Sequence, residues 1–284
     1  MAKTHSQPPF PIGSTTSRTI QKVTGVTWLS CFVAGKVAEH RLHQKLGKGD
    51  IKVKVKLFSL TDLIAGKIKS VNVSISRCLI KSMPIGDVSL ASSGPIWYDP
   101  GFGGVRAGLR NPIMLNLKAH LNRDQVALVV QTPQIASALR GLKLDLPGLG
   151  SQQLQVIDPK VELGDGLIKI QTMLVTEGAP EETAVHLTIS GKPEIEGSRM
   201  YLRDMNVESP DIEDPTEFAK FTDELLNPIV DFGRMDRKDH ALRLTDIQVK
   251  PDVVTGIGTL VLAPKNDVQL AQTNTSRKHH LRFF

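Results

Sequence analysis

The residues best able to do chemistry are few and lie far apart in the chain. His40 and His43 stand three positions apart, so a helix could present both imidazoles on one face. No HExxH pattern and no third ligand accompanies them, and a protein zinc site uses at least three ligands. The pair is therefore interpreted as two solvated polar residues, and we expect no metal.

A glycine-rich stretch, GFGGVRAG at residues 101–108, has the composition of a phosphate-binding loop but not its spacing. Arg106 stands where the GxGxxG pattern requires its third glycine, and no Lys-Ser or Lys-Thr pair follows. The stretch is typical of a loop after the turn at residues 97–100. We expect no nucleotide and no other cofactor.

The sequence patterns also give little support for a catalytic nucleophile or a catalytic pair of carboxylates. Cys31 and Cys78 are the only cysteines, and neither has a His or Asn context that would activate it. No GxSxG elbow is present. The carboxylates of residues 204–214 are typical of strand ends and a helix cap, although folding could still bring an acid pair together. These patterns favour a protein that is not an enzyme.

Composition indicates a globular protein with an aliphatic interior. The 284 residues are 40% apolar but only 5% aromatic. Burial must therefore come mainly from Val, Ile, Leu and Met. Such side chains fill cores, and they also line cavities that accept flexible apolar ligands.

Charge is unevenly distributed along the chain. Residues 1–81 carry 14 Lys/Arg and 3 Asp/Glu, whereas residues 82–284 carry 21 and 26. The basic segment, residues 1–81, has few aromatic residues that could stack on bases and no known nucleic-acid-binding motif. We therefore expect no nucleic-acid partner. An anionic membrane surface fits better, at about 1 kcal/mol per nearby Lys or Arg. Lys52, Lys54 and Lys56 form the predicted membrane-surface stripe; a solvated basic face is the alternative.

The apolar segments are too short to predict a transmembrane helix. The longest uncharged one, residues 23–35, has 13 residues, whereas a span needs about 20. Arg18 and Lys22 precede it as in a signal peptide, but no small-residue cleavage site follows. We expect peripheral membrane association, with the cytoplasmic side favoured and the envelope side as the alternative.

The predicted organisation is one domain between two tails. Residues 1–17 are expected to be disordered, residues 18–264 to form the domain, and residues 265–284 to be a flexible basic tail. A long helix is predicted from Arg18 to Leu46, because large apolar residues recur at helical spacing and should face the core. These residues are Val26, Leu29, Val33 and Val37.

Strands dominate the rest of the domain. Apolar and polar residues alternate over residues 51–56, 71–76 and 114–122, and again around Val126, Leu128 and Val130. Short connections, including Gly-Asp-Gly at 164–166, predict an antiparallel meander. Two further helices are predicted at 132–141 and 214–233. The predicted fold class is α+β.

The stretch SLTDLIAGKIKSVNVSIS, residues 59–76, changes period halfway. Ser59 can cap a short helix that Gly66 ends, and an alternating strand follows. With its continuation to residue 94, through Met83-Pro84-Ile85 and Asp87-Val88, it resembles the LmeA-like phospholipid-binding family, especially its branch in photosynthetic bacteria. Weaker similarity covers residues 192–210 and 240–264.

This resemblance implies a tubular lipid-binding fold, in which a strongly curved antiparallel sheet wraps around a long helix. Its apolar lumen would hold the acyl chains of a phospholipid or another lipid. The candidate lining residues are Trp28, Leu29, Phe32, Val33, Val71, Val73, Ile75, Val88, Leu90, Leu115, Leu117, Val126 and Leu128. A fully packed core without a cavity is the alternative interpretation of the same faces.

The leading hypothesis is therefore a non-catalytic lipid-binding or lipid-transfer protein at a membrane surface. The competing hypothesis is an assembly or scaffold protein that uses the same fold to bind a protein partner without lipid. An enzyme with scattered carboxylates is the third. No pattern in the sequence specifies the oligomeric state or the lipid.

Overall fold

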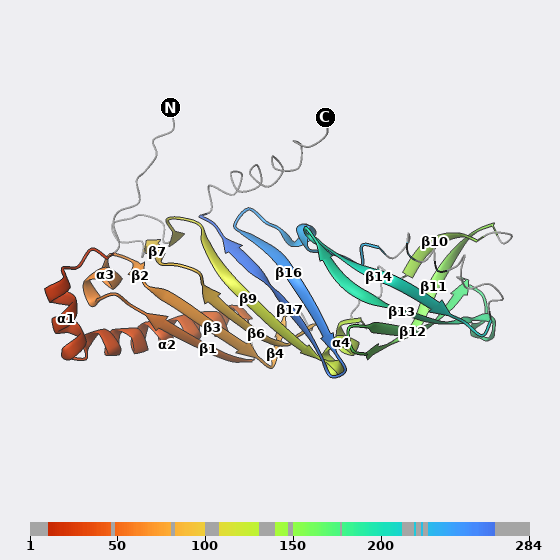
Figure 1. The fold of residues 1–284 in the computed structure, drawn as a ribbon, viewed down its shortest axis with the longest axis horizontal. Coiled ribbons are helices and arrows are strands. Elements are labelled where there is room, and N and C mark those ends of the chain that lie inside the picture. The colour runs from red at the N-terminus through yellow and green to blue at the C-terminus, as the bar shows by residue number, and fades with distance from the viewer. Residues whose placement is uncertain are drawn as a thin grey trace, which may run out of the picture.

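The computed structural model is an elongated α+β molecule in which strands predominate (Figure 1). It describes residues 11–46, 49–80, 83–99, 108–130, 140–146, 150–176, 178–211, 219, 223 and 227–264. Four α-helices lie within these ranges. The predicted fold class is confirmed in this coarse form, and the predicted C-terminal tail lies outside the described residues.

Two helices, not one, open the described chain. Helix α1 (Thr15–Val23) is capped by the Ser14 side chain, and helix α2 (Val26–Leu46) follows after a break. Gly25 makes this break with a φ of 75°, which an L-residue rarely adopts. The single predicted helix is therefore corrected to two. Residues 11–17 also belong to the folded part, so the predicted disordered tail is too long.

Helix α2 packs on the edge strand β1 (Asp50–Lys56) through small side chains. Gly35 permits the closest approach, because a Cβ there would lie 2.8 Å from the Val53 carbonyl oxygen. The Val53 amide, on the unpaired edge of β1, donates to Oε1 of Glu39 at 3.0 Å. The helix thus covers a sheet edge that would otherwise be open. The predicted sheet wrapped around this helix is not confirmed.

Glu39 makes this helix–strand contact sensitive to pH. The hydrogen bond from Lys36 and then the Val53 amide lower the pKa of Glu39 below its ordinary value of 4.5. A lowered folded-state pKa stabilises the protein above the ordinary value, and this contribution is lost as pH falls through the lowered pKa.

We expect the melting temperature of the wild type to exceed that of the Glu39→Gln variant at neutral pH. The difference should shrink below about pH 4, where the carboxylate becomes protonated. Thermal unfolding followed by circular dichroism from pH 3 to pH 7 measures it, with Glu182→Gln at an exposed position as the control. A difference that stays constant with pH would contradict the assignment.

One six-stranded antiparallel sheet forms the half of the molecule next to these helices. Its order is β1, β3 (Ser70–Ser76), β6 (Asp87–Ser92), β9 (Ile113–Asn122), β17 (Val253–Leu262) and β16 (His240–Lys250). The alternation predicted for 51–56, 71–76 and 114–122 is confirmed as strands β1, β3 and β9. Apolar residues share one face of this sheet because side chains alternate along each strand.

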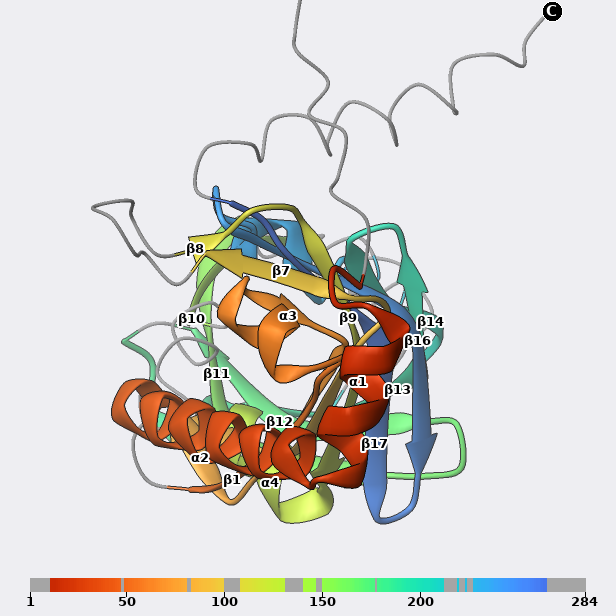
Figure 2. The same cartoon turned by 90° about the vertical axis from the view of Figure 1, so that its left-hand side faces the viewer.

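A second six-stranded sheet continues the molecule. Its order is β10 (Arg140–Leu146), β11 (Gly150–Leu163), β12 (Ile168–Thr176), β13 (Val185–Glu196), β14 (Arg199–Glu208) and β15 (Val230–Asp231). Val161 and Leu163 of β11 pack with Val249 and Val254 of the first sheet, so the two sheets share a core. Seen from the α1 end, the strands curl into a half-barrel (Figure 2).

Shorter elements complete the fold. Helix α3 (Leu60–Ile64) has Ser59 as its cap and Gly66 at a φ of 74° after it, as predicted. The small strands are β2 (Lys67–Ile68), β7 (Ile96–Asp99), β8 (Gly108–Leu109), β4 (Cys78–Ile80) and β5 (Met83–Ile85), and the 3-10 helices are η2 (Glu181–Thr183) and η3 (Phe232–Met235).

The two further predicted helices are largely untested. Most of residues 132–141 and 214–233 lie outside the described residues. The end of the first, residues 140–141, belongs to strand β10, and the end of the second contains β15, so both predicted helices are too long. The fourth observed helix is α4 (Arg123–Val130), where an alternating strand was predicted.

Candidate functional site

The sheet brings together seven of the predicted lining residues. Val71, Val73 and Ile75 of β3 pair across the sheet with apolar positions of β1 on one side. On the other side they continue into β6 and β9, as the strand registers require. The residues on this surface, here called the inner apolar face, are Val71, Val73, Ile75, Val88, Leu90, Leu115 and Leu117, together with Ile51, Val53 and Val55 of β1.

Like β1, two more strands that supplied no predicted lining residue contribute to the inner apolar face. Strand pairing places residues of β17 beside Leu115 and Leu117, and residues of β16 beside those of β17, on the same face of the sheet. The added residues are Gly256, Gly258, Leu260, Leu242, Leu244 and Ile247. All six strands therefore contribute to one continuous apolar surface.

Burial along this face is uneven. Ile51, Val53 and Val55 are buried in a cluster with small side chains of α2. Leu115 is buried in a second cluster with residues of β7. Val88, Leu90 and Leu117 of the central strands β6 and β9 are only half-buried. Leu244 of the edge strand β16 is half-buried as well. The middle of the inner apolar face thus keeps accessible apolar area, which is costly in water and favourable beneath an apolar ligand.

Four predicted lining residues lie elsewhere. Trp28, Leu29, Phe32 and Val33 lie on α2, and their exposed fractions are 71, 56, 54 and 53%. The α2 side chains that pack on β1 are instead Cys31, Ala34, Ala38, Leu42 and Leu46. The first half of the helix thus turns these four large apolar residues away from the sheet, and the structure does not place them with the inner apolar face.

Two more predicted lining residues are on α4 rather than on a strand. Val126 is half-buried against the core shared by the two sheets, whereas Leu128 is 53% exposed. The helix begins at Asn122 and Gln125, whose side chains each accept a hydrogen bond from the other's amide, at 2.8 and 2.9 Å. This reciprocal cap was the sequence signal for a helix. The prediction of a strand here is corrected.

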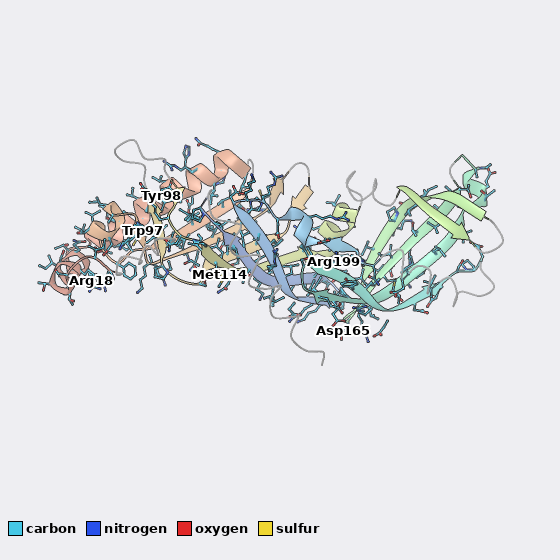
Figure 3. All side chains as sticks on the ribbon, turned by 90° about the horizontal axis from the view of Figure 1, so that it is seen from above. Arg18, Trp97, Tyr98, Met114, Asp165 and Arg199 are labelled. Carbon is cyan, nitrogen blue, oxygen red and sulfur yellow. The ribbon has the colours of Figure 1, made fainter. Side chains whose placement is uncertain are left out.

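The predicted basic stripe is exposed as expected. Lys52, Lys54 and Lys56 point to the opposite face of β1 from Ile51, Val53 and Val55, and pair there with Ser74, Asn72 and Ser70. The outer face of the sheet is therefore polar and basic at its β1 edge. Figure 3 shows how side chains cover the length of the molecule, from Arg18 at the α1 end to Arg199 and Asp165 in the other half.

A hollow of about 530 Å³ opens where β3 ends and β6 begins. It is lined by Ile75 and Val88 from the inner apolar face and by polar side chains from the outer one. The polar lining includes Arg77, Asp87 and His120, and Nδ1 of His120 lies 2.9 Å from the Thr255 hydroxyl. At this hollow, residues of the inner apolar face lie beside polar residues of the outer face.

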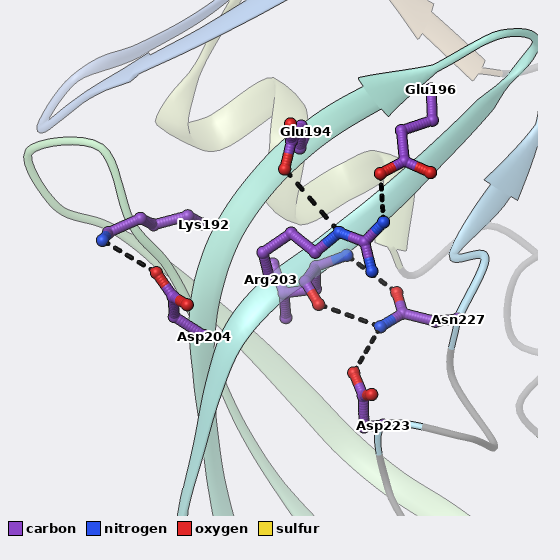
Figure 4. A network of polar contacts seen from close by, with 8 residues as sticks. Lys192, Glu194, Glu196, Arg203, Asp204, Asp223 and Asn227 are labelled. Carbon is purple, nitrogen blue, oxygen red and sulfur yellow. Dashed lines mark hydrogen bonds and ion pairs between the residues drawn. The ribbon is translucent and has the colours of Figure 1, made fainter.

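Polar networks elsewhere hold strands together. Asn227 accepts from the Leu202 amide at 2.7 Å and donates to the Leu202 carbonyl at 2.9 Å, so its side chain pairs with β14 as a strand would (Figure 4). In the same figure Arg203 bridges Glu194 and Glu196. These groups satisfy one another's hydrogen-bonding capacity and hold neighbouring segments of the second sheet together.

The clearest pKa shift near the first sheet has a structural cause. The guanidinium of Arg243 makes two hydrogen bonds to Asp236, of 2.7 and 2.6 Å, and lowers the pKa of that carboxyl. Within the described ranges no group of three His, Cys, Asp or Glu residues could hold a metal ion. No helix among these residues is long and apolar enough to cross a bilayer.

Comparisons with protein-family models, with curated proteins and with solved structures found no match to this chain. Its candidate site is therefore defined by geometry: an apolar surface across six strands, half-buried at its centre and without a charged side chain among its members. Such a surface can bind an apolar ligand with a free energy that depends on the apolar area buried. None of the residues on this face carries a group that could transfer a proton.

Proposed function

We propose that the protein is a non-catalytic lipid-binding or lipid-transfer protein that works at a membrane surface. Acyl chains of a phospholipid or a similar lipid would lie along the inner apolar face. The observation that carries this proposal is the half-buried middle of that face, around Val88, Leu90 and Leu117. The resemblance of residues 59–94 to the LmeA-like family favours the same function.

The tubular form of the fold is part of this proposal. The curled sheets supply the concave wall, and α2 along the β1 edge would help to close it around a chain. Lys52, Lys54 and Lys56 would attract the protein to anionic lipid, acting within about 8 Å at physiological salt.

The chemistry of the face suits reversible exchange. Each buried methylene contributes roughly 0.8 kcal/mol, so a lipid with on the order of 30 methylenes gains about 24 kcal/mol gross. A membrane offers nearly the same gain, so the net preference for either site is small. A face that binds lipid only through buried apolar area therefore favours a carrier that takes up lipid from a membrane and releases it again.

Extraction of the purified protein with organic solvent tests the proposal. We expect a lipid in near-stoichiometric amount, identified by mass spectrometry, and its loss after delipidation on an apolar resin. Reloading from vesicles should restore it. Protein that carries no lipid and takes none up would contradict lipid binding, and a co-purified polypeptide in its place would favour the scaffold hypothesis.

A further inference from the structure

The exposed apolar side chains of this protein gather at one end. Of the fourteen large apolar residues that are strongly exposed within the described ranges, ten belong to the first three helices or directly precede them. They are Ile12, Ile20, Val23, Val26, Trp28, Leu29, Phe32, Val33, Val37 and Ile64. Figure 2 views this end, with α1, α2 and α3 toward the reader. A cluster of this kind marks an interaction surface.

Helix α2 has apolar residues both on the side that packs against β1 and on the side that is exposed. Its inner side uses small residues to approach β1, while its outer side carries large ones over residues 26–37. Trp28 and Phe32, one turn apart, stack with ring centroids 6.0 Å apart. Beyond residue 37 the outer side is polar, with His40, His43 and Gln44 exposed. The exposed apolar area of α2 is thus confined to its first half, which together with α1 is here called the helical tip.

The helical tip is anchored to the rest of the fold. Oε1 of Gln21 on α1 accepts from the Leu60 amide of α3 at 2.7 Å. Just before α1, the Ile12 amide donates to Oδ1 of Asp62 at 2.7 Å, and the Ser59 hydroxyl donates to Oδ2 of this buried carboxylate at 2.6 Å. The apolar residues are therefore presented by a supported surface and not by a detached helix.

Charge around the helical tip has one dominant sign. Residues 11–56 contain nine Lys or Arg and two Asp or Glu, and both acids are already paired, Glu39 with Lys36 and Asp50 with Arg77. Lys22 and Lys36 are exposed beside the apolar residues of α1 and α2. An exposed apolar surface with basic residues beside it complements the interface of an anionic bilayer, where Trp side chains are also favoured.

We propose that the helical tip inserts into the interfacial layer of an anionic bilayer, with Trp28 and Phe32 reaching the boundary between head groups and acyl chains. An interfacial helix buries its apolar face about 5–10 Å deep. This inference rests on the proposed function in one respect only: it places a lipid-binding protein against the membrane that supplies its lipid. The inserting element is distinct from the lysine stripe, which lies on the outer face of β1.

The test measures vesicle binding and insertion depth separately. Vesicles contain equimolar phosphatidylcholine and phosphatidylglycerol, and the protein carries Trp97→Phe so that Trp28 is its only tryptophan. Phe32→Ser should weaken binding about tenfold, the factor that corresponds to 1.4 kcal/mol. Lipids brominated in the acyl chain should quench Trp28 fluorescence.

Matched controls exist elsewhere on the surface. Leu128 and Met114 are 53 and 52% exposed, close to the 54% of Phe32, but they lie outside the helical tip. Leu128→Ser and Met114→Ser should leave vesicle binding within about twofold of the parent protein, because a change in exposed area away from the bilayer has no effect on insertion.

Two results would overturn the inference. One is vesicle binding by Phe32→Ser equal to that of the controls, with no quenching of Trp28. The other is a parent protein that self-associates through this surface, seen as a dimer that Phe32→Ser converts to a monomer. Neither result depends on the lipid content of the purified protein, so failure of the inference is distinguishable from failure of the proposed function.

Discussion

Replacing Gly86 with alanine is expected to destabilise the protein by about 3 kcal/mol or more, because overpacking against a rigid neighbour forces backbone to move. Gly86 directly precedes β6, where this strand meets β9. A Cβ at this position would lie 1.7 Å from the His120 carbonyl oxygen and 2.7 Å from its carbonyl carbon. Main-chain atoms cannot rotate aside as a side chain can, so β6 and β9 must separate.

A second glycine provides the control. Gly94, two residues after β6, has no atom within 4 Å of the position that a Cβ would occupy. Gly94→Ala should therefore stay within about 0.5 kcal/mol of the wild type. Thermal unfolding measures both variants, at roughly 2–4 °C per kcal/mol for a chain of this size. Equal melting temperatures for the two variants would contradict the close approach of β6 to β9.

The strands were predictable because their signal is local. Alternation over residues 51–56 and 71–76 required only that one side of each strand be apolar, and the pairing of β1 with β3 then placed the apolar sides together. The hairpin at Gly-Asp-Gly was predictable for the same reason, and Gly166 has the positive φ that the turn requires.

The orientation of α2 was not predictable from the same kind of reasoning. Large apolar residues at helical spacing ordinarily face a core. Here the buried side is set by the edge strand, whose backbone approaches Gly35 and whose amide hydrogen-bonds to Glu39. Small residues permit that approach in the first half of α2, so the large residues there lie on the outside. The decisive partner, β1, follows closely in the chain, but the helical pattern alone does not show which side of α2 it approaches.

The extent of the inner apolar face was hidden by an irregularity in β16. Simple alternation from Leu242 and Leu244 would place Asp246 on the apolar side. The register shifts between Leu244 and Asp246, so Ile247 takes that side and Asp246 does not. A β-bulge of this kind adds one residue to a strand and reverses its pattern beyond that point. The predicted lining residues in this sheet therefore lie on three strands, β3, β6 and β9, where six contribute.

Leu117→Asp is expected to remove bound lipid and leave the lipid-free fold nearly unchanged. Leu117 lies on β9 in the middle of the inner apolar face, paired with Leu90 of β6 and Gly258 of β17. A carboxylate there would have to lose its water beneath an acyl chain without gaining a partner. We expect lipid occupancy to fall about a hundredfold, which corresponds to roughly 3 kcal/mol.

Stability of the same variant separates an accessible face from a packed core. Leu117 is half-buried, so in lipid-free protein the new carboxylate can remain hydrated. The cost in unfolding free energy should then be about 1 kcal/mol. In a fully packed core the same change would bury an unpaired charge and cost more than about 4 kcal/mol. Denaturant unfolding of delipidated protein measures this difference.

The neighbouring residue supplies the control for charge. Asn116 lies on the same strand, is exposed on the outer face, and receives the same carboxylate in Asn116→Asp. If acyl chains bind the inner apolar face, Asn116→Asp retains the lipid content of the wild type, measured by extraction and mass spectrometry, while Leu117→Asp does not. A lipid content that stays equal in the two variants would place the lipid elsewhere. A Leu117→Asp protein that unfolds without lipid would instead identify this face as a closed core, and the lipid-carrier proposal would then lose its binding site.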